Sequence, residues 1–585
     1  MAVAGAVSAR RLFRGASTPD GWAWTTLAVA ALAATPILSV VWTAVTPTLD
    51  IWHHLASTVL PDYVWTSFLL AVGVALGTAA IGVATAWLVT MYRFPGSRAF
   101  EWLLLLPLAM PAYLVAYVYT DLLEYAGPVQ GFLRALFGWA NAREYWFPEV
   151  RSLGGAVILF SLVLYPYVYL VSRAAFIEQN ICVLEASRLL GCTPWRTFRR
   201  VALPLARPAV AIGVILALME TLNDLGAVEF FALRTFTVGI FDVWMNMGNA
   251  AGAAQLALVL LVVIAGLIWA ERAARRQRRF HHTSGRYRRL APRRLSGRAA
   301  TGAFLVCALP VLLGFLLPST VLAWYAFTDW HPERLPNFLL LAEHSLLLAG
   351  IAALAASVFG LVLAYGAREG APPIAQGAAR FVSLGYAVPG AVLALGVMIP
   401  LASLDRSIDA LARAEFGIST GLLFSGTLFA VSAALTVRFL ALAYGTIDAG
   451  LSKVTPNIDS AARTLGHGPL ARLARVHLPI VRGSVLTGAL LVFVDSMKEL
   501  PMTLILRPFN YETLATNVYQ YASDELLEEC ALPALAIVLA GVLPVLLLTR
   551  IIGHSRAGDE LVPHRAGGPA GGGAPAAIPI PAPGP

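Results

Sequence analysis

The sequence has 585 residues, of which 58% are hydrophobic and only 13% are charged, with a formal net charge of +9. Soluble domains average roughly 45–50% apolar and about 25% charged residues, so this composition excludes an ordinary soluble domain and indicates a polytopic membrane protein. Arginines on one side of the predicted spans largely account for the positive charge, so no nucleic-acid partner is needed to explain it.

Apolar runs long enough to cross a bilayer recur along the whole chain. A spanning helix needs about 20 such residues, and hydrocarbon offers no hydrogen-bond partners to an irregular backbone, so each run is expected to be helical. The sequence therefore predicts an all-α protein with about twelve transmembrane helices in two homologous six-helix halves. The predicted spans lie near residues 22–46, 63–90, 100–123, 152–173, 207–232, 252–271, 299–327, 343–366, 379–402, 420–445, 483–506 and 530–551.

The predicted spans divide the chain into four parts. Residues 1–272 form the first half, 273–298 a basic linker, 299–553 the second half, and 554–585 a tail rich in Gly, Pro and Ala that is expected to be disordered. The arginines of the linker have two interpretations. They orient the flanking helices from the cytoplasm, or they also bind anionic lipid headgroups.

One polar segment occurs twice between the apolar runs, at residues 184–208 and 459–483. Both copies contain Arg-x-Leu-Gly-x-x-Pro followed by Val-x-Leu-Pro, so the chain is a tandem duplication. The two copies align without a gap, and we call their constant separation in sequence number the repeat offset. The matched pairs are Ala186/Ala461, Arg188/Arg463, Leu190/Leu465, Gly191/Gly466, Pro194/Pro469, Val201/Val476, Leu203/Leu478 and Pro204/Pro479.

Each repeated segment is predicted to form two short helices that meet at a glycine. The first copy places apolar residues so that they face one groove, as in the docking of a helix into a partner, with arginines opposite. The apolar set is Leu189, Leu190, Phe198, Val201 and Leu203, and the basic set is Arg188, Arg196, Arg199 and Arg200. The alternative is a cytoplasmic loop that packs on the protein itself.

The lysines exclude one kind of active site. Only Lys453 and Lys498 occur in the chain, and neither lies in a G-x-x-x-x-G-K-[ST] sequence, so no P-loop is present. Catalytic motifs of membrane-surface enzymes are also lacking, and no metal site is firmly predicted because Cys and His pairs with zinc-like spacing are absent. The chain is therefore expected to be a transport subunit without a bound cofactor, and any ATP must be hydrolysed by another polypeptide.

The repeated segment resembles the EAA loop in the membrane subunits of binding-protein-dependent ABC importers. The resemblance lies in Glu185-Ala186-Ser187-Arg188-x-Leu190-Gly191 with Val201-x-Leu203-Pro204, and in the second copy from Asp459 to Pro479. It implies a fused pair of type I permease halves in a bacterial inner membrane. The implied partners are two copies of an ATPase subunit and a solute-binding protein. The implied ATPase-coupling residues are Glu185, Ala186, Arg188, Gly191, Pro204, Asp459, Ala461, Arg463, Gly466 and Pro479.

The second copy departs from that pattern at its acidic position. Ser460 matches Glu185, and Asp459 lies one position earlier. The segments with their arginines all fall on one side of the alternating spans, which the positive-inside rule assigns to the cytoplasm. Both termini are expected on that side.

Acidic residues recur at a second duplicated site, late in the fifth predicted span of each half. Glu220 and Asp224 match Asp495 and Glu499 at the same repeat offset, and a spacing of four predicts that each pair shares a helix face. Charged groups within a span are costly and usually line an aqueous path, so these acids and Lys498 are candidates for the translocation pathway. The alternative is a structural network in which Lys498 pairs with Asp495 or Glu499.

The flanking sequences resemble the ferric-iron branch of fused permeases, at residues 224–237 and 498–510. Carboxylates suit a hard trivalent cation, which prefers oxygen ligands. Two alternatives are kept. Thiamine, phosphonate or another small solute would use the same class of importer, and an ion-gradient-driven secondary transporter also has two six-span halves but would not need the repeated loop.

Overall fold

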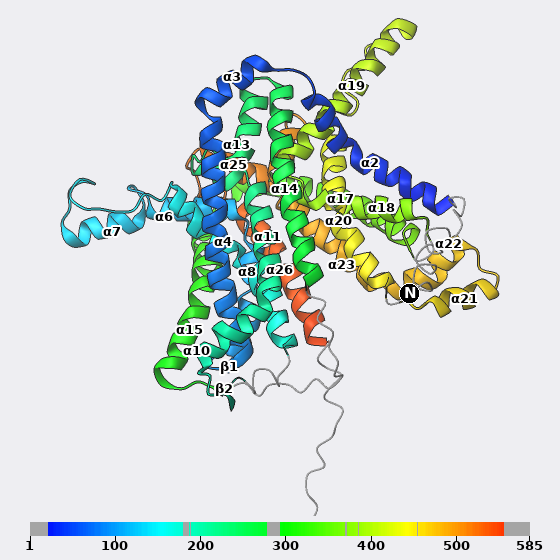
Figure 1. The fold of residues 1–585 in the computed structure, drawn as a ribbon. Helices are drawn as coiled ribbons and strands as arrows, with labels where there is room; N and C mark the ends of the chain where they lie inside the picture. Colours follow the sequence, from blue (N-terminus) through cyan, green and yellow to red (C-terminus); the bar gives the residue numbers. More distant parts are fainter. Residues whose placement is uncertain are drawn as a thin grey trace, which may run out of the picture. The chain divides into compact units, whose positions relative to one another are not determined.

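The computed structural model describes residues 21–179, 187, 189–277, 293–368, 371–383, 385–452 and 454–554. The elements of the first half are α2 (Gly21–Ala44), α3 (Leu49–Thr58), α4 (Leu60–Met91), β1 (Tyr92–Arg93), α5 (Ser97–Leu103), η1 (Leu106–Ala109), α6 (Ala112–Leu123), α7 (Pro128–Phe137), α8 (Leu153–Glu178), α10 (Pro194–Thr197), η2 (Phe198–Ala202), α11 (Leu203–Asn223), α12 (Gly226–Phe230), α13 (Phe236–Phe241), η3 (Asp242–Asn246) and α14 (Ala250–Gln277) (Figure 1).

The second half repeats this order. Its elements are β2 (Arg293–Arg294), α15 (Gly297–Val311), η4 (Leu312–Leu316), α16 (Leu317–Thr328), η5 (Pro332–Arg334), α17 (Leu335–Gly366), α18 (Pro373–Val382), η6 (Gly385–Ala387), α19 (Gly390–Phe416), α20 (Leu428–Leu451), α21 (Pro456–Thr464), α22 (Pro469–Arg472), η7 (Leu473–His477), α23 (Leu478–Met497), α24 (Pro501–Leu506), α25 (Leu514–Ser523) and α26 (Ala531–His554). The linker 273–298 and the tail 554–585 fall largely outside the described residues.

The all-α membrane class is confirmed, and the described residues hold ten to eleven candidate spans where about twelve were predicted. Across the described ranges, ten helices are long and apolar enough to cross a bilayer, and an eleventh candidate is bent by 89° between Ala109 and Ala112. Pro111 interrupts that candidate, because it cannot donate the hydrogen bond that a continuous helix requires. The predicted span near 530–551 corresponds to α26, of which Ala531–Leu546 is a shorter apolar helix.

The duplication is visible in the boundaries of the helices. Helix α4 and helix α17 both have 32 residues, and their first and last residues are separated by the repeat offset. The same offset relates the starts of α8 and α20, of α11 and α23, and of α12 and α24. The central part of each half is therefore the same structure built twice.

Close helix crossings are also duplicated. Gly213 of α11 meets α8, where an added Cβ would lie 2.6 Å from Val168 Cα. Its counterpart Gly488 in α23 meets α20, where an added Cβ would lie 2.4 Å from Thr446 Oγ1 and 3.4 Å from Ala443 Cα. Small residues let membrane helices approach closely where water cannot drive their association. Each half thus has a tightly packed three-helix core, of α4, α8 and α11 or of α17, α20 and α23.

The first helix of each half packs against the other half. Helix α2 contacts α17, α18 and α19, whereas α15, η4 and α16 contact α4, α5, α6 and α8. Glycines permit both crossings. An added Cβ on Gly396 of α19 would lie 2.3 Å from the carbonyl of Pro36, and one on Gly314 of η4 would lie 2.5 Å from the carbonyl of Leu162. The two halves are therefore interlocked.

A widened turn precedes the long helix after each repeated segment. Residues Phe198–Ala202 and Leu473–His477 form π-helical turns, immediately before Leu203-Pro204 and Leu478-Pro479. Proline lacks an N–H and its ring crowds the carbonyl four residues earlier, so a turn bonded five residues apart relieves the conflict. The Leu-Pro sequence that the two copies share therefore bends the chain into the membrane helix instead of ending it.

Candidate functional site

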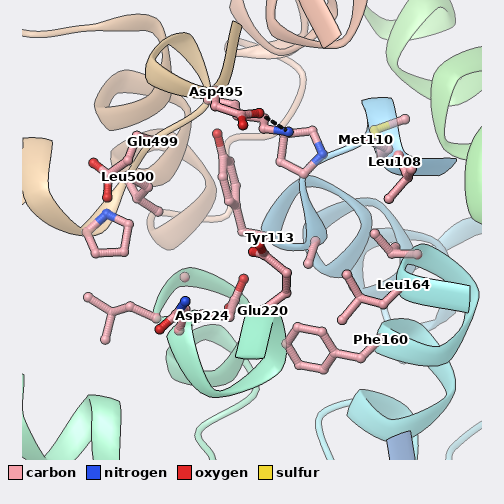
Figure 2. A pocket seen from close by; sticks show the side chains of 18 of the residues that line it. Leu108, Met110, Tyr113, Phe160, Leu164, Glu220, Asp224, Asp495, Glu499 and Leu500 are labelled. Carbon is pink, nitrogen blue, oxygen red and sulfur yellow. Dashed lines mark ion pairs between the residues drawn. The ribbon is translucent and has the colours of Figure 1, made fainter. Parts of the chain in front are cut away.

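A cavity of about 140 Å³ lies where the two halves meet. Its wall includes Tyr113, Val163, Glu220, Asn223 and Asp224 from the first half. The second half contributes Tyr386, Arg438, Asp495, Lys498 and Glu499. Figure 2 shows Glu220 and Asp224 on one ribbon of the wall, and Asp495 and Glu499 on another. All five residues predicted for the pathway therefore line one cavity.

A break in each long helix positions the second acid of each pair. Helix α11 ends at Asn223, and the Asp224 carboxylate accepts a hydrogen bond from Ala227 N–H at 2.8 Å, at the start of α12. Helix α23 ends at Met497, and the Glu499 carboxylate accepts bonds from the N–H groups of Met502 and Thr503 at 3.1 Å. A carboxylate that accepts from a free helix N-terminus is stabilised there.

These breaks correct the prediction that each acidic pair shares one helix face. Only Glu220 and Asp495 lie within α11 and α23, whereas Asp224 and Glu499 follow the last helical turn. The prediction assumed one continuous span from 207 to 232 and another from 483 to 506. Carboxylates that cap the next short helix interrupt both spans.

On the second-half wall, both carboxylates have a cation. Arg438 of α20 donates from Nη1 to Glu499 Oε1 at 3.1 Å, and both side chains are at most 10% exposed. Lys498 Nζ lies 2.8 Å from Asp495 Oδ1, with the two side chains 31% and 18% exposed. The structure thus favours the network interpretation for Lys498, with Asp495 as its partner. Arg438 was not among the residues predicted for the pathway, although an arginine inside the predicted span 420–445 required a partner.

The first-half wall carries the same two acids without the cations. At the repeat offset, Asn223 occupies the place of Lys498 and Val163 that of Arg438. Glu220 accepts a hydrogen bond from the Tyr386 hydroxyl at 3.1 Å. Within the described ranges, neither Glu220 nor Asp224 has an ion-pair partner. The cavity therefore has a second-half wall whose acids are paired with cations and a first-half wall whose described acids are not.

Two neutral oxygen atoms on the first-half wall are also unsatisfied. The Tyr113 hydroxyl and the Asn223 Oδ1 are buried and lack a hydrogen-bond partner within the described part of the chain. Buried polar atoms nearly always have partners, so these two oxygens lack the partner that such atoms usually have. Figure 2 shows Tyr113 together with Glu220 and Asp224 among the residues that line the cavity.

The repeated segments form the predicted turn at their glycines. Gly191 and Gly466 both have a φ of +80°, and at either position an added Cβ would have no atom of the described chain within 4 Å. In the second copy, His467 N–H donates to the Ala462 carbonyl and Gly466 N–H donates to the Arg463 carbonyl, at 3.1 Å and 3.0 Å. This is the Schellman arrangement that ends a helix at a left-handed glycine.

Exposed apolar side chains project from each repeated segment. Leu190 is 85% exposed and its counterpart Leu465 is 76% exposed, while Trp195 and its counterpart Leu470 are 67% and 72% exposed. Exposed apolar side chains at matching positions of two copies mark an interaction surface. We call Leu190 with Trp195, and Leu465 with Leu470, the apolar tips of the two segments.

The predicted composition of this apolar surface needs correction. Leu189 and Leu190 are exposed, but Phe198, Val201 and Leu203 pack against the buried cluster that includes Phe176 and Ala202. The Phe198 ring also contacts Trp87, with 5.0 Å between the ring centroids. These three residues attach the segment to its own half, because the π-helical turn rotates them toward the core.

Of the predicted coupling residues in the second segment, Asp459 has partners within the chain. Its carboxylate lies 2.7 Å from Arg368 Nη2 and 2.8 Å from His477 Nε2. Ala461, Arg463 and Pro479 are exposed. In the first copy, Gly191 and Pro204 are described, whereas Glu185, Ala186 and Arg188 lie outside the described residues. The role of these side chains toward an ATPase stays a prediction.

No resident metal site is indicated by the side chains that can be placed. In the ranges that the structure describes, no three His, Cys, Asp or Glu residues form a group that could hold a metal ion. The cavity acids are distributed over two walls, and the second-half pair is occupied by cations. This arrangement suits passage of a solute better than its permanent ligation.

Comparison with known proteins gives relatives of both the whole chain and its halves. The chain is 25% identical to the Fe(3+)-transport system permease protein FbpB 2 of Haemophilus influenzae, over 83% of this chain and 88% of that protein. It is 29% identical to the molybdenum transport system permease protein ModB of Escherichia coli, over 37% of this chain and 97% of that protein. The sulfate transport system permease protein CysW of Escherichia coli is 26% identical over 37% of this chain and 74% of its own length.

A family model matches the chain twice, at residues 78–279 and 356–557. The two matches cover more than half of the sequence, and each contains one acidic pair and one repeated segment. The family describes a membrane permease component and not a hydrolysing enzyme. This protein therefore belongs to the family of the binding-protein-dependent transport system inner membrane component.

Proposed function

We propose that this permease subunit of an ABC importer carries ferric iron through the cavity between its halves. The observation that carries the proposal is the unequal charge of the two walls. Glu220 and Asp224 have no ion-pair partner in the described part of the chain, and unsatisfied oxygens of Tyr113 and Asn223 accompany them. Carboxylate, phenol and amide oxygens are the ligands that a hard trivalent cation prefers.

The charge balance of the cavity also argues against an anionic solute. Its lining residues include four carboxylates but only two cations, Arg438 and Lys498, both of which are paired. An unpaired anion in a low-dielectric site repels other anions strongly. Sulfate or a phosphonate would therefore face a barrier on the first-half wall, whereas a cation would be attracted to it.

The full-length likeness to a named Fe(3+)-transport permease supports the same choice. The likenesses to molybdenum and sulfate permeases each cover 37% of the chain. Thiamine, which is itself a cation, is the second candidate, because the first-half wall would also attract an organic cation.

Uptake by the complete system tests this proposal. The permease is assembled with its ATPase and a binding protein in sealed vesicles, and ATP-dependent accumulation of radiolabelled ferric iron is compared with that of labelled thiamine, phosphonate and sulfate. Ferric iron is expected to accumulate, and the substitution Asp224→Asn is expected to slow it by about tenfold, which corresponds to about 1.4 kcal/mol of lost attraction. Accumulation of an anion but not of iron would contradict the proposal.

We further propose that the apolar tips enter grooves in two ATPase subunits on the cytoplasmic face. In this arrangement ATP closes the ATPase pair, and the two segments transmit the motion to α11 and α23 through the π-helical turns. The orientation can be tested by impermeant thiol labelling in a cysteine-free background. Leu190→Cys and Leu465→Cys should react only from the cytoplasmic side, and Ala140→Cys and Gln520→Cys only from outside.

A further inference from the structure

An apolar groove with a volume of 1020 Å³ lies between α4 and α15, apart from the cavity described above. Its walls are formed by small and apolar side chains, among them Ala80, Trp87, Gly302 and Val306, and by Trp195 and Phe198 of the first repeated segment. Of the described residues that line it, Arg293 is the only charged one. The groove is therefore a hydrocarbon-like surface with a single cation.

Strand pairing fixes the position of that cation. Arg293 pairs with Tyr92 in the parallel β1–β2 bridge, and Leu295 N–H donates to the Arg93 carbonyl at 2.8 Å. Tyr92 follows the last residue of α4, and Arg293 precedes the first turn of α15. Arg293 therefore lies beside the ends of both spans, where lipid headgroups are expected.

The length of the groove matches one leaflet of a bilayer. The α4 residues that line it run from Ala79 to Leu88, with Tyr92 at its end. The helix from Ala79 to Tyr92 extends about 20 Å at roughly 1.5 Å per residue, and one leaflet has about 15 Å of hydrocarbon below its headgroups. An acyl chain can therefore lie along α4 while a headgroup reaches Arg293.

The equivalent place in the second half is filled by protein. There α2 packs on α17, so Leu363, the counterpart of Leu88, is fully buried in a cluster with Ala30. Trp22 also contacts Tyr365, with ring centroids 4.8 Å apart. On the first-half side, by contrast, a Cβ added to Gly302 of α15 would have no atom of the described residues within 4 Å. Of the two equivalent places, the one beside α17 is therefore filled by α2, whereas the one beside α4 is left as a groove.

We propose that this groove binds an anionic diacyl phospholipid, whose phosphate lies at Arg293 and whose acyl chain lies against α4 and α15. The lipid supplies the apolar contact that α2 supplies in the second half. Because the groove also includes Trp195 and Phe198, the bound lipid supports the segment that carries the first apolar tip.

Lipid retention by the purified complex of permease and ATPase tests the proposal. The complex is exchanged into detergent with equal amounts of dioleoyl phosphatidylglycerol and dioleoyl phosphatidylcholine, and retained lipid is counted by native mass spectrometry. Wild type is expected to favour phosphatidylglycerol by about fivefold for one basic contact. Arg293→Gln should remove that preference, and Gly302→Leu should remove the retained lipid by filling the groove.

Gly266→Leu is the matched control, because Gly266 also has an open surrounding but lies in α14 outside the groove. It should retain lipid as wild type does. Equal retention of both lipids in wild type, or unchanged retention in Gly302→Leu, would overturn the proposal.

Tryptophan quenching gives a second measurement that does not need a disruptive variant. Brominated phosphatidylglycerol should quench the part of the emission that is lost in Trp87→Phe, because Trp87 lines the groove. Brominated phosphatidylcholine at the same concentration should quench that part less. Equal quenching by the two lipids would mean that the groove takes any lipid and that Arg293 selects nothing.

Discussion

The two walls of the central cavity descend from one sequence but differ in charge. The second-half wall holds Glu499 and Asp495 against Arg438 and Lys498, whereas the first-half wall has Val163 and Asn223 at the places of the two cations. Both halves break the long helix within one residue of the same aligned position, and in each the second acid accepts backbone hydrogen bonds from the next short helix. The comparison teaches that a duplicated scaffold can keep its geometry while one copy becomes a structural ion-pair network and the other remains open to a solute.

The largest expected loss of stability comes from a substitution in the second-half wall. Arg438→Met leaves the Glu499 carboxylate buried without its cation, which costs about 3–5 kcal/mol for a buried pair. The yield of folded protein in detergent and its thermal unfolding should both fall sharply. Arg438→Met combined with Glu499→Gln should recover much of the loss, because the amide oxygen still accepts from the backbone of Met502. No difference between the single and double variants would mean that the pair is not the reason for the loss.

The second prediction concerns a variant in which the first-half wall gains a cation, as the second-half wall already has. Val163→Arg places a cation across from Asp224, as Arg438 stands to Glu499, so uptake of ferric iron should fall by about tenfold or more. Val163→Met is the control for the added volume. The measurement is initial uptake relative to the amount of assembled complex. If Val163→Arg transports as well as Val163→Met, the unpaired charge of the first-half wall is not what attracts the solute.

The third prediction concerns the two repeated segments, whose glycine turns have the same conformation in both halves. Gly191→Val and Gly466→Val each force a branched residue into a left-handed conformation, which costs about 1–2 kcal/mol locally. The turn should rearrange and displace the apolar tip, so ATP hydrolysis continues while uptake falls. The ratio of solute transported to ATP hydrolysed measures this uncoupling. A normal ratio in both variants would show that the glycine turns do not transmit the motion.

The smallest effect is expected at Lys498. Its side chain and that of Asp495 are 31% and 18% exposed, more than those of Arg438 and Glu499, so water in the cavity can partly solvate Asp495 and Lys498→Met should cost less than Arg438→Met. Thermal unfolding of Lys498→Met beside Arg438→Met tests this ranking of the two pairs. Equal losses would show that Lys498 is held as tightly as Arg438.

The sequence alone identified the features that depend on periodicity and repetition. The long apolar runs predicted the membrane helices, and the constant repeat offset predicted that Glu220, Asp224, Asp495 and Glu499 occupy equivalent places. Hydropathy did not locate the helix breaks, because the residues around them are still apolar. The Asp-Leu-Gly and Glu-Leu-Pro sequences were the available signal, since an acid followed by Gly or Pro favours a capped new helix.

Pairing between distant residues could not be predicted in the same way. Arg438 and Glu499 are 61 residues apart, and only the packing of α20 against α23 brings them together. The absence of Lys498 and Arg438 equivalents in the first half could be read from the aligned copies, but its meaning depended on knowing that Val163 and Asn223 line the same cavity. The open groove beside α4 could not be predicted either, because it depends on the position of α15.

The crossing of the first helices has a consequence for biosynthesis. Helix α2 is made early, yet its partners α17 to α19 begin only at Leu335, long after α2 ends at Ala44. At about 5–20 residues per second, the ribosome needs roughly 15–60 s to reach the first of them. During that interval the inserted helix has only lipid and its own half around it. The contacts of α2 with the second half must therefore form late, whereas those with α14 of its own half can form earlier.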